Sequence, residues 1–160
     1  MKQKELAAAL KCIVILCLLA GIGLCGVLLP MYGATIAKVD VEYAWLFWPC
    51  LAGLWALCVP VLIVLALVWQ MAGRIGADNS FCVENAQALK WICALAVLDT
   101  GLCLVGGLAL AVILRGLPPF LLLLCAAVML VGAAIAVVSA VLSHLIQKAA
   151  DLKADQDLTI

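Results

Sequence analysis

The sequence predicts an all-α fold, a four-transmembrane-helix bundle in a single domain of residues 1–160. Its composition is 69% hydrophobic and only 11% charged, with nine basic and nine acidic residues, too few to cover a water-soluble globule. Four apolar runs are each long enough to cross about 30 Å of hydrocarbon at roughly 1.5 Å per residue. In lipid we expect these runs to be helical, because each backbone polar group must find its partner within its own segment.

The four runs are taken in chain order. We expect helices at about residues 8–31, 44–73, 83–114 and 118–150, followed by a tail at 151–160. The first run is too long and lacks a good cleavage site for a signal peptide, so we expect it to be retained. Residues 32–43 should form a short extended piece or an interfacial segment. Pro60 should bend the second helix because proline removes one backbone hydrogen bond.

The third and fourth runs are separated only by residues 115–117. A connection this short predicts that the third and fourth helices form a tight antiparallel hairpin.

Basic residues indicate the orientation. In a four-span arrangement only Lys38 and Arg115 lie on one side, and the remaining basic residues lie on the other: Lys2, Lys4, Lys11, Arg74, Lys90, Lys148 and Lys153. By the positive-inside rule, both termini and the loop at 72–90 are cytoplasmic. The sequence thus predicts a multi-pass protein of the cell membrane.

The nine cysteines invite a redox or metal interpretation. All except Cys82 fall within or beside apolar runs, there is no C-x-x-C, and His144 is the only histidine. Structural disulfides need an oxidising compartment, whereas these thiols would lie in lipid or face the cytosol. We interpret them as small polarizable apolar side chains and expect no metal or cofactor, with a haem or metal site as the alternative.

The loop before the third run is the most polar interior stretch. Short polar side chains followed by an acid-bearing first turn predict a helix start, with Phe81 placed as a hydrophobic staple. The alternative is a cytoplasmic docking surface, because loops on a rigid scaffold often carry function. Its candidate residues are Asp78, Asn79, Ser80, Phe81, Glu84 and Asn85.

This loop and the end of the chain resemble the bacterial membrane family catalogued as domain of unknown function 2975. The resemblance rests on Ile75, Phe81, Asn85, Leu89 and Ile92, and on Leu142, Ser143, Ala150, Leu152 and 157–160. It implies four transmembrane helices and, as a partner, a small helix-turn-helix transcriptional regulator. Members commonly have serine or threonine where this chain has Cys82, so the resemblance leaves the helix cap to Ser80 or Asp78.

Asp99 is predicted to lie inside the membrane. It stands nine residues past Lys90, roughly 13 Å deep at helical rise. A carboxylate there costs at least ~2.5 kcal/mol, so it should face other helices and find a partner. Cys103 shares its face, and Ser139 and Ser143 share a face of the fourth helix. We expect a hydrogen bond between Asp99 and Ser139, or a water-filled pocket beside them. This buried polar face is either an interhelical clamp or a proton, ion or ligand site.

The tail combines polar residues with an apolar end. It is either a frayed terminus or a recognition tail that presents Leu158, Thr159 and Ile160 to a partner.

The sequence contains no phosphate-binding glycine loop, no usefully spaced carboxylate pair and no Ser/His/Asp set on one side of the membrane, so we expect no enzyme. The net charge of zero excludes a basic nucleic-acid-binding surface. The leading hypothesis is sensing or relay through the cytoplasmic loop and tail. The alternatives are a small transporter or immunity-type protein that uses the face around Asp99, and a structural subunit of a membrane complex. Helices rich in small residues are also compatible with self-association.

Overall fold

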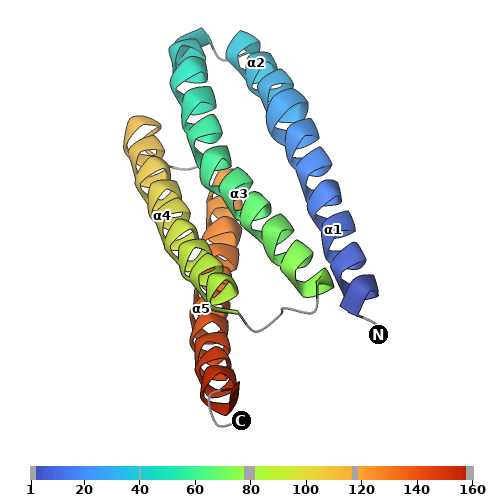
Figure 1. The fold of residues 1–160 in the computed structure, drawn as a ribbon. Helices are drawn as coiled ribbons and strands as arrows, with labels where there is room; N and C mark the ends of the chain where they lie inside the picture. The colour runs from blue at the N-terminus through green and yellow to red at the C-terminus, as the bar shows by residue number, and fades with distance from the viewer. Residues whose placement is uncertain (1–2, 40, 78–81, 117–118, 158–160) are drawn as a thin grey trace.

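The computed structural model describes residues 3–39, 41–77, 82–116 and 119–157, and every regular element assigned within them is helical (Figure 1). Among these residues, four stretches are long and apolar enough to cross a membrane: Gln3–Thr35, Ala44–Gly76, Val83–Ile113 and Leu121–Leu152. The predicted all-α fold with four membrane-spanning helices is therefore confirmed, and the pattern is that of a multi-pass membrane protein. Large apolar side chains are exposed along all four stretches, as contact with lipid requires.

The first stretch consists of three joined helical segments. These are α1 (Gln3–Gly23), the π-helical turn η1 (Leu24–Leu28) and α2 (Leu29–Val39). Helical structure begins before the apolar run because the residues ahead of it, ELAAALK, are strong helix formers. Residues 32–39 were expected to lie in an extended or interfacial segment, but the helix continues through them, and Thr35 donates a hydrogen bond to the Met31 carbonyl.

A short 3₁₀-helix, η2 (Val41–Leu46), leads into α3 (Phe47–Gly76). Pro60 lies inside α3 and is buried, and the helix changes direction part-way along its length (Figure 1). The loss of one backbone hydrogen bond at the proline explains such a bend.

The remaining helices are α4 (Val83–Ile113) and α5 (Pro119–Asp157). After α4, Arg115 adopts a left-handed backbone conformation with φ of 54°. The amide of Gly116 donates to the carbonyl of Ala111, and that of Arg115 donates to Val112. This is a Schellman motif, which satisfies the last carbonyls of the helix and stops it abruptly.

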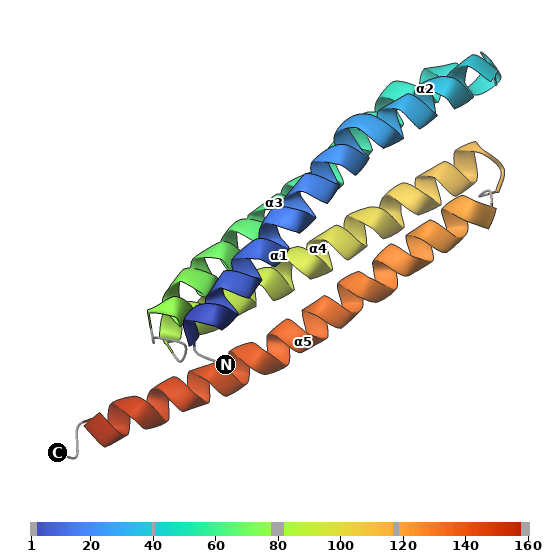
Figure 2. The ribbon, with the colours of Figure 1, turned by 90° about the vertical axis from the view of Figure 1, so that its right-hand side faces the viewer.

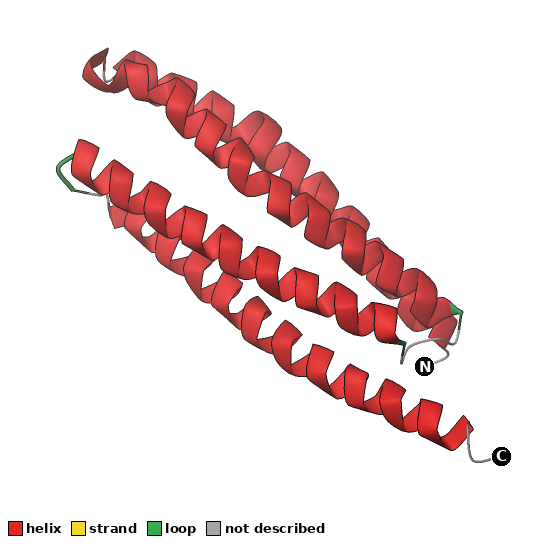
Figure 3. Cartoon of the chain, turned by 60° about the vertical axis from the view of Figure 1, so that its left-hand side comes forward, coloured by secondary structure: helices red, strands yellow, loops and turns green. Residues whose placement is uncertain are grey.

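The helices pack in chain order. α1 packs on α3, α3 on α4, and α4 on α5, with the last pair in the most extensive contact (Figures 2 and 3). In the described part of the chain, no close backbone contact joins α1 to α4 or α5, or α3 to α5. The most apolar window of α4 is 17% buried, against 6% for each of the other three stretches, so α4 is the most enclosed helix.

Four basic residues, Lys4, Lys11, Arg74 and Lys90, lie at the end of the bundle where α1 begins, α3 ends and α4 begins (Figure 2). We call this end the basic end. There Lys90 donates a 2.8 Å hydrogen bond to Gln147 of α5. The last turns of α5 project beyond the other helices at this end (Figure 2).

Candidate functional site

Asp99 lies near the middle of α4 and is half-buried. Its carboxylate interacts electrostatically with the thiol of Cys58 in α3 and with that of Cys103 one turn farther along α4. Its Oδ1 atom is buried and accepts no hydrogen bond. Because a buried polar atom without a partner is unfavourable, such an atom in a folded protein calls for an explanation.

Thiols from the other helices gather near this carboxylate. Cys25, in the π-helical turn, interacts with Cys58, and Cys125 of α5 interacts with Cys103. We call Cys25, Cys58, Asp99, Cys103 and Cys125 the Asp99 cluster. All four membrane-spanning stretches contribute to it, and one contributes through a π-helical turn, a local irregularity that is frequent at functional sites. No three ligand-type side chains among the described residues are placed to hold a metal ion.

The predicted hydrogen bond between Asp99 and Ser139 does not form, and this prediction was wrong. Thr100 of α4 packs tightly against Gly132 of α5. Ser139 is seven residues beyond Gly132, so it lies roughly 10 Å farther along the helix, at 1.5 Å per residue. The alternative expectation, a water-filled pocket beside Asp99 and Ser139, stays a prediction.

The polar residues predicted on α5 are buried but do not join the Asp99 cluster. Ser139 is 6% exposed and Ser143 is 5% exposed, and Ser143 donates a 3.0 Å hydrogen bond to the Ala140 carbonyl. Together with Gly132 and Ala136 they form the stripe of α5 that faces α4. In this stripe small side chains allow close helix packing.

A second polar contact joins α3 to α4 at the basic end. Asn85, in the first turn of α4, is 1% exposed, and its Oδ1 accepts a 3.3 Å hydrogen bond from Arg74 near the end of α3. Cys82 precedes this turn in an extended conformation and makes no side-chain cap. Asn85 was expected on a docking surface, but its burial makes it a link between the two helices, and only Glu84 of that set is described as exposed.

We expect Asn85→Ala to lower the free energy of unfolding by about 1–3 kcal/mol, because the Arg74 guanidinium loses a buried acceptor. The measurement is denaturant unfolding of the purified protein in mixed micelles. Gln87→Ala, at an exposed position one half-turn away, is the control and should change stability by no more than about 0.5 kcal/mol. Equal losses in the two variants would contradict the role given to Asn85.

The family of the chain follows from a comparison with family models. The model described as a protein of unknown function, DUF2975, matches residues 31–160. The chain belongs to this family. The match includes Cys58, Asp99, Cys103 and Cys125, whereas Cys25 and the first lysines precede it. No curated protein and no solved structure matches the chain.

Several predicted site residues of this DUF2975 member lie outside the described residues. They are Asp78, Asn79, Ser80 and Phe81 in the loop, and Leu158, Thr159 and Ile160 in the tail.

Four residues of this DUF2975 member that the structure brings into or beside the Asp99 cluster are not among the predicted site residues: Cys25, Cys58, Cys125 and Thr100. In the sequence the three thiols look like the other apolar cysteines. Thr100 donates a 2.7 Å hydrogen bond to the Ala96 carbonyl and packs on Gly132. The sequence did offer a signal for Thr100, because it is a polar residue directly after the intramembrane acid Asp99. No signal in the sequence pointed to the three thiols, because their approach depends on how the helices align with one another.

Proposed function

We propose that this DUF2975 protein is a non-enzymatic relay that senses a condition in the membrane core and transmits it to the cytoplasm through α5. The observation that supports this most is the continuity of α5. The same helix packs at Gly132 on Thr100 of α4, the residue that directly follows Asp99, and runs without a break to Asp157 beyond the other helices (Figure 2). A small shift of a packed helix in the core would therefore displace its projecting end.

The proposal includes an orientation in which the basic end faces the cytoplasm. The excess of lysine and arginine at that end supports this, by the positive-inside rule. With epitope tags on both termini, a protease added outside intact cells should leave both tags uncut. Cleavage of either tag would overturn the orientation and, with it, a relay toward the cytoplasm.

The proposed receiver is a cytoplasmic transcriptional regulator of the helix-turn-helix class, which the family resemblance implies. Co-purification in mild detergent tests this, with the full chain compared with a variant that ends at Lys148. We expect a DNA-binding protein, identified by mass spectrometry, to be retained by the full chain and lost from the shortened one. If no such protein is retained, or if it remains bound without the projecting part of α5, the relay proposal fails.

A second candidate function is the transfer of a proton or cation through the membrane core. The unpartnered Oδ1 atom of Asp99 favours it, because intramembrane acids often mark ion pathways. Proteoliposomes loaded with a pH-sensitive dye test it directly. Flux that is present in the wild type and abolished by Asp99→Asn would support transport, whereas no flux in the wild type would remove this candidate.

A further inference from the structure

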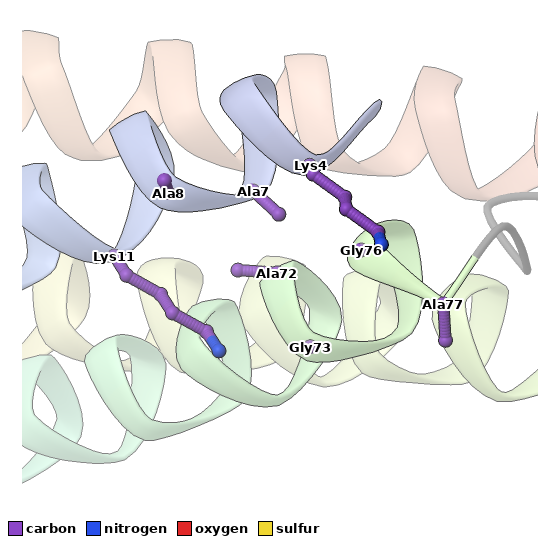
Figure 4. A pocket seen from close by; sticks show the side chains of 8 residues that line it. All are labelled: Lys4, Ala7, Ala8, Lys11, Ala72, Gly73, Gly76 and Ala77. Atoms are coloured by element: carbon purple, nitrogen blue, oxygen red, sulfur yellow. The ribbon is translucent and has the colours of Figure 1, made fainter. Parts of the chain in front are cut away.

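A shallow groove lies between α1 and α3 at the basic end (Figure 4). It encloses about 420 Å³, and most of its lining is made of alanine and glycine. Among the lining residues, Ala7 of α1 and Gly76 of α3 lie in close contact. A Cβ added to Gly76 would be only 3.2 Å from the Cβ of Ala7. The small residues let the two helices approach and leave room above them.

Two lysines of α1, Lys4 and Lys11, border the groove two turns apart. Both side chains extend from α1 toward α3 (Figure 4). The ammonium group of Lys11 lies 5.3 Å from the ring centroid of Trp69 on α3, a cation–π distance. Glu5, which follows Lys4 in the sequence, is exposed and does not line the groove. The groove therefore presents positive charge over a floor of small apolar residues.

The position of the groove along the helices restricts what can occupy it. The apolar run of the first stretch begins at Cys12, directly after Lys11, and Trp69 is an amphipathic side chain of the kind enriched at membrane surfaces. The groove thus lies at the height of the lipid headgroups. A ligand that fits it carries negative charge toward the lysines and apolar chains toward the adjoining hydrocarbon.

We propose that this groove binds the headgroup of an anionic phospholipid from the surrounding bilayer. Lys4 and Lys11 contact the phosphate, and Gly73 and Ala77, which are exposed in the groove, provide the surface on which the headgroup rests. Basic pockets between transmembrane helices bind anionic headgroups in this way, since the charge is neutralised while the acyl chains stay in the membrane. The proposal does not depend on the relay function.

Native mass spectrometry of the full chain tests the proposal. The protein is purified in mixed micelles that contain equal amounts of phosphatidylglycerol and phosphatidylcholine, and the lipids retained after detergent removal are counted. We expect the wild type to retain phosphatidylglycerol preferentially. The double variant Lys4→Gln/Lys11→Gln should weaken this retention by about fivefold for each lysine.

Two further variants distinguish lipid binding in the groove from a general attraction of anionic lipid to positive charge on the protein. Lys38→Gln/Lys148→Gln removes the same charge from exposed positions outside the groove and should leave retention unchanged. Gly73→Leu keeps both lysines but places an apolar side chain in the groove; Gly73 is exposed, and an added Cβ there meets nothing within 4 Å. The retention of phosphatidylglycerol should fall several-fold in this variant. It also tests the groove independently if the double lysine variant does not fold.

Three outcomes would overturn the proposal. One is equal loss of phosphatidylglycerol in the groove variants and the control double variant. Another is unchanged retention in Gly73→Leu. The third is displacement of the lipid by millimolar inorganic phosphate, which would show that the groove takes a free anion and not a membrane lipid.

Discussion

Replacing Gly132 with alanine is expected to lower the free energy of unfolding by about 1–3 kcal/mol, the usual effect of overpacking a close contact. A Cβ added to Gly132 would overlap Thr100 Oγ1, which is held in place by its hydrogen bond to the Ala96 carbonyl. Either the two helices must separate or Thr100 must give up that bond. Unfolding in mixed micelles, followed by circular dichroism, measures the loss.

A second substitution at the same contact should restore the stability that Gly132→Ala loses. In Gly132→Ala/Thr100→Ala the overlapping oxygen is gone, and the new Cβ would lie 3.5 Å from that of residue 100, an ordinary van der Waals distance. We expect the double variant to recover most of the lost stability. Gly106→Ala, where an added Cβ meets nothing within 4 Å, controls for the general gain in helix propensity. If Thr100→Ala gives no recovery, the Thr100–Gly132 contact does not determine the spacing of α4 and α5.

Replacing Asp99 with leucine is expected to stabilise the fold, by about 2–3 kcal/mol on membrane-insertion scales. The Oδ1 atom of Asp99 is buried and accepts no hydrogen bond, so the leucine variant removes a polar group that gains little from its surroundings. The same unfolding measurement as for Gly132 applies. A stabilised variant that has lost its partner binding or ion flux would show that the acid is retained for function.

Asp99→Asn keeps the size of the side chain while removing its charge, and it serves as the comparison. We expect it to fold and to lose the same functional readout as the leucine variant. If Asp99→Leu instead lowers stability by several kcal/mol, the carboxylate acts as an interhelical clamp, and a role in sensing or transport is not needed to explain it.

The membrane-spanning helices could be predicted from the sequence because lipid leaves the backbone no alternative to helical hydrogen bonding. The ends of these helices could be predicted less accurately. The first helix begins at Gln3 and the last ends at Asp157, several residues outside the apolar runs. Apolar composition marks where lipid is, whereas backbone hydrogen bonding continues wherever the residues favour a helix.

The candidate site could be predicted only in part. Asp99 was recognised because an acid within an apolar run is conspicuous, and the stripe of Ser139 and Ser143 because its spacing is helical. Their pairing was misjudged because depth was counted from Lys90 and Lys148, and long lysine side chains reach along the helix to find polar surroundings. The alignment of α4 and α5 is set instead where Thr100 packs on Gly132.

The π-helical turn at Leu24–Leu28 has a consequence for how the first membrane span meets α3. Ala7 is in contact with Gly76, and Gly33 lies against Phe47, so both ends of this span are directed toward α3. At roughly 100° per residue, an uninterrupted α-helix would leave Ala7 and Gly33 about 80° apart around its axis. The wider turn absorbs one residue and reduces this offset to roughly 20°. Removing a single residue from 24–28 would therefore give a regular α-helix with both ends still directed toward α3. If the turn became α-helical with all five residues kept, the amino-terminal half, with Lys4 and Lys11, would rotate away from α3 and out into the lipid.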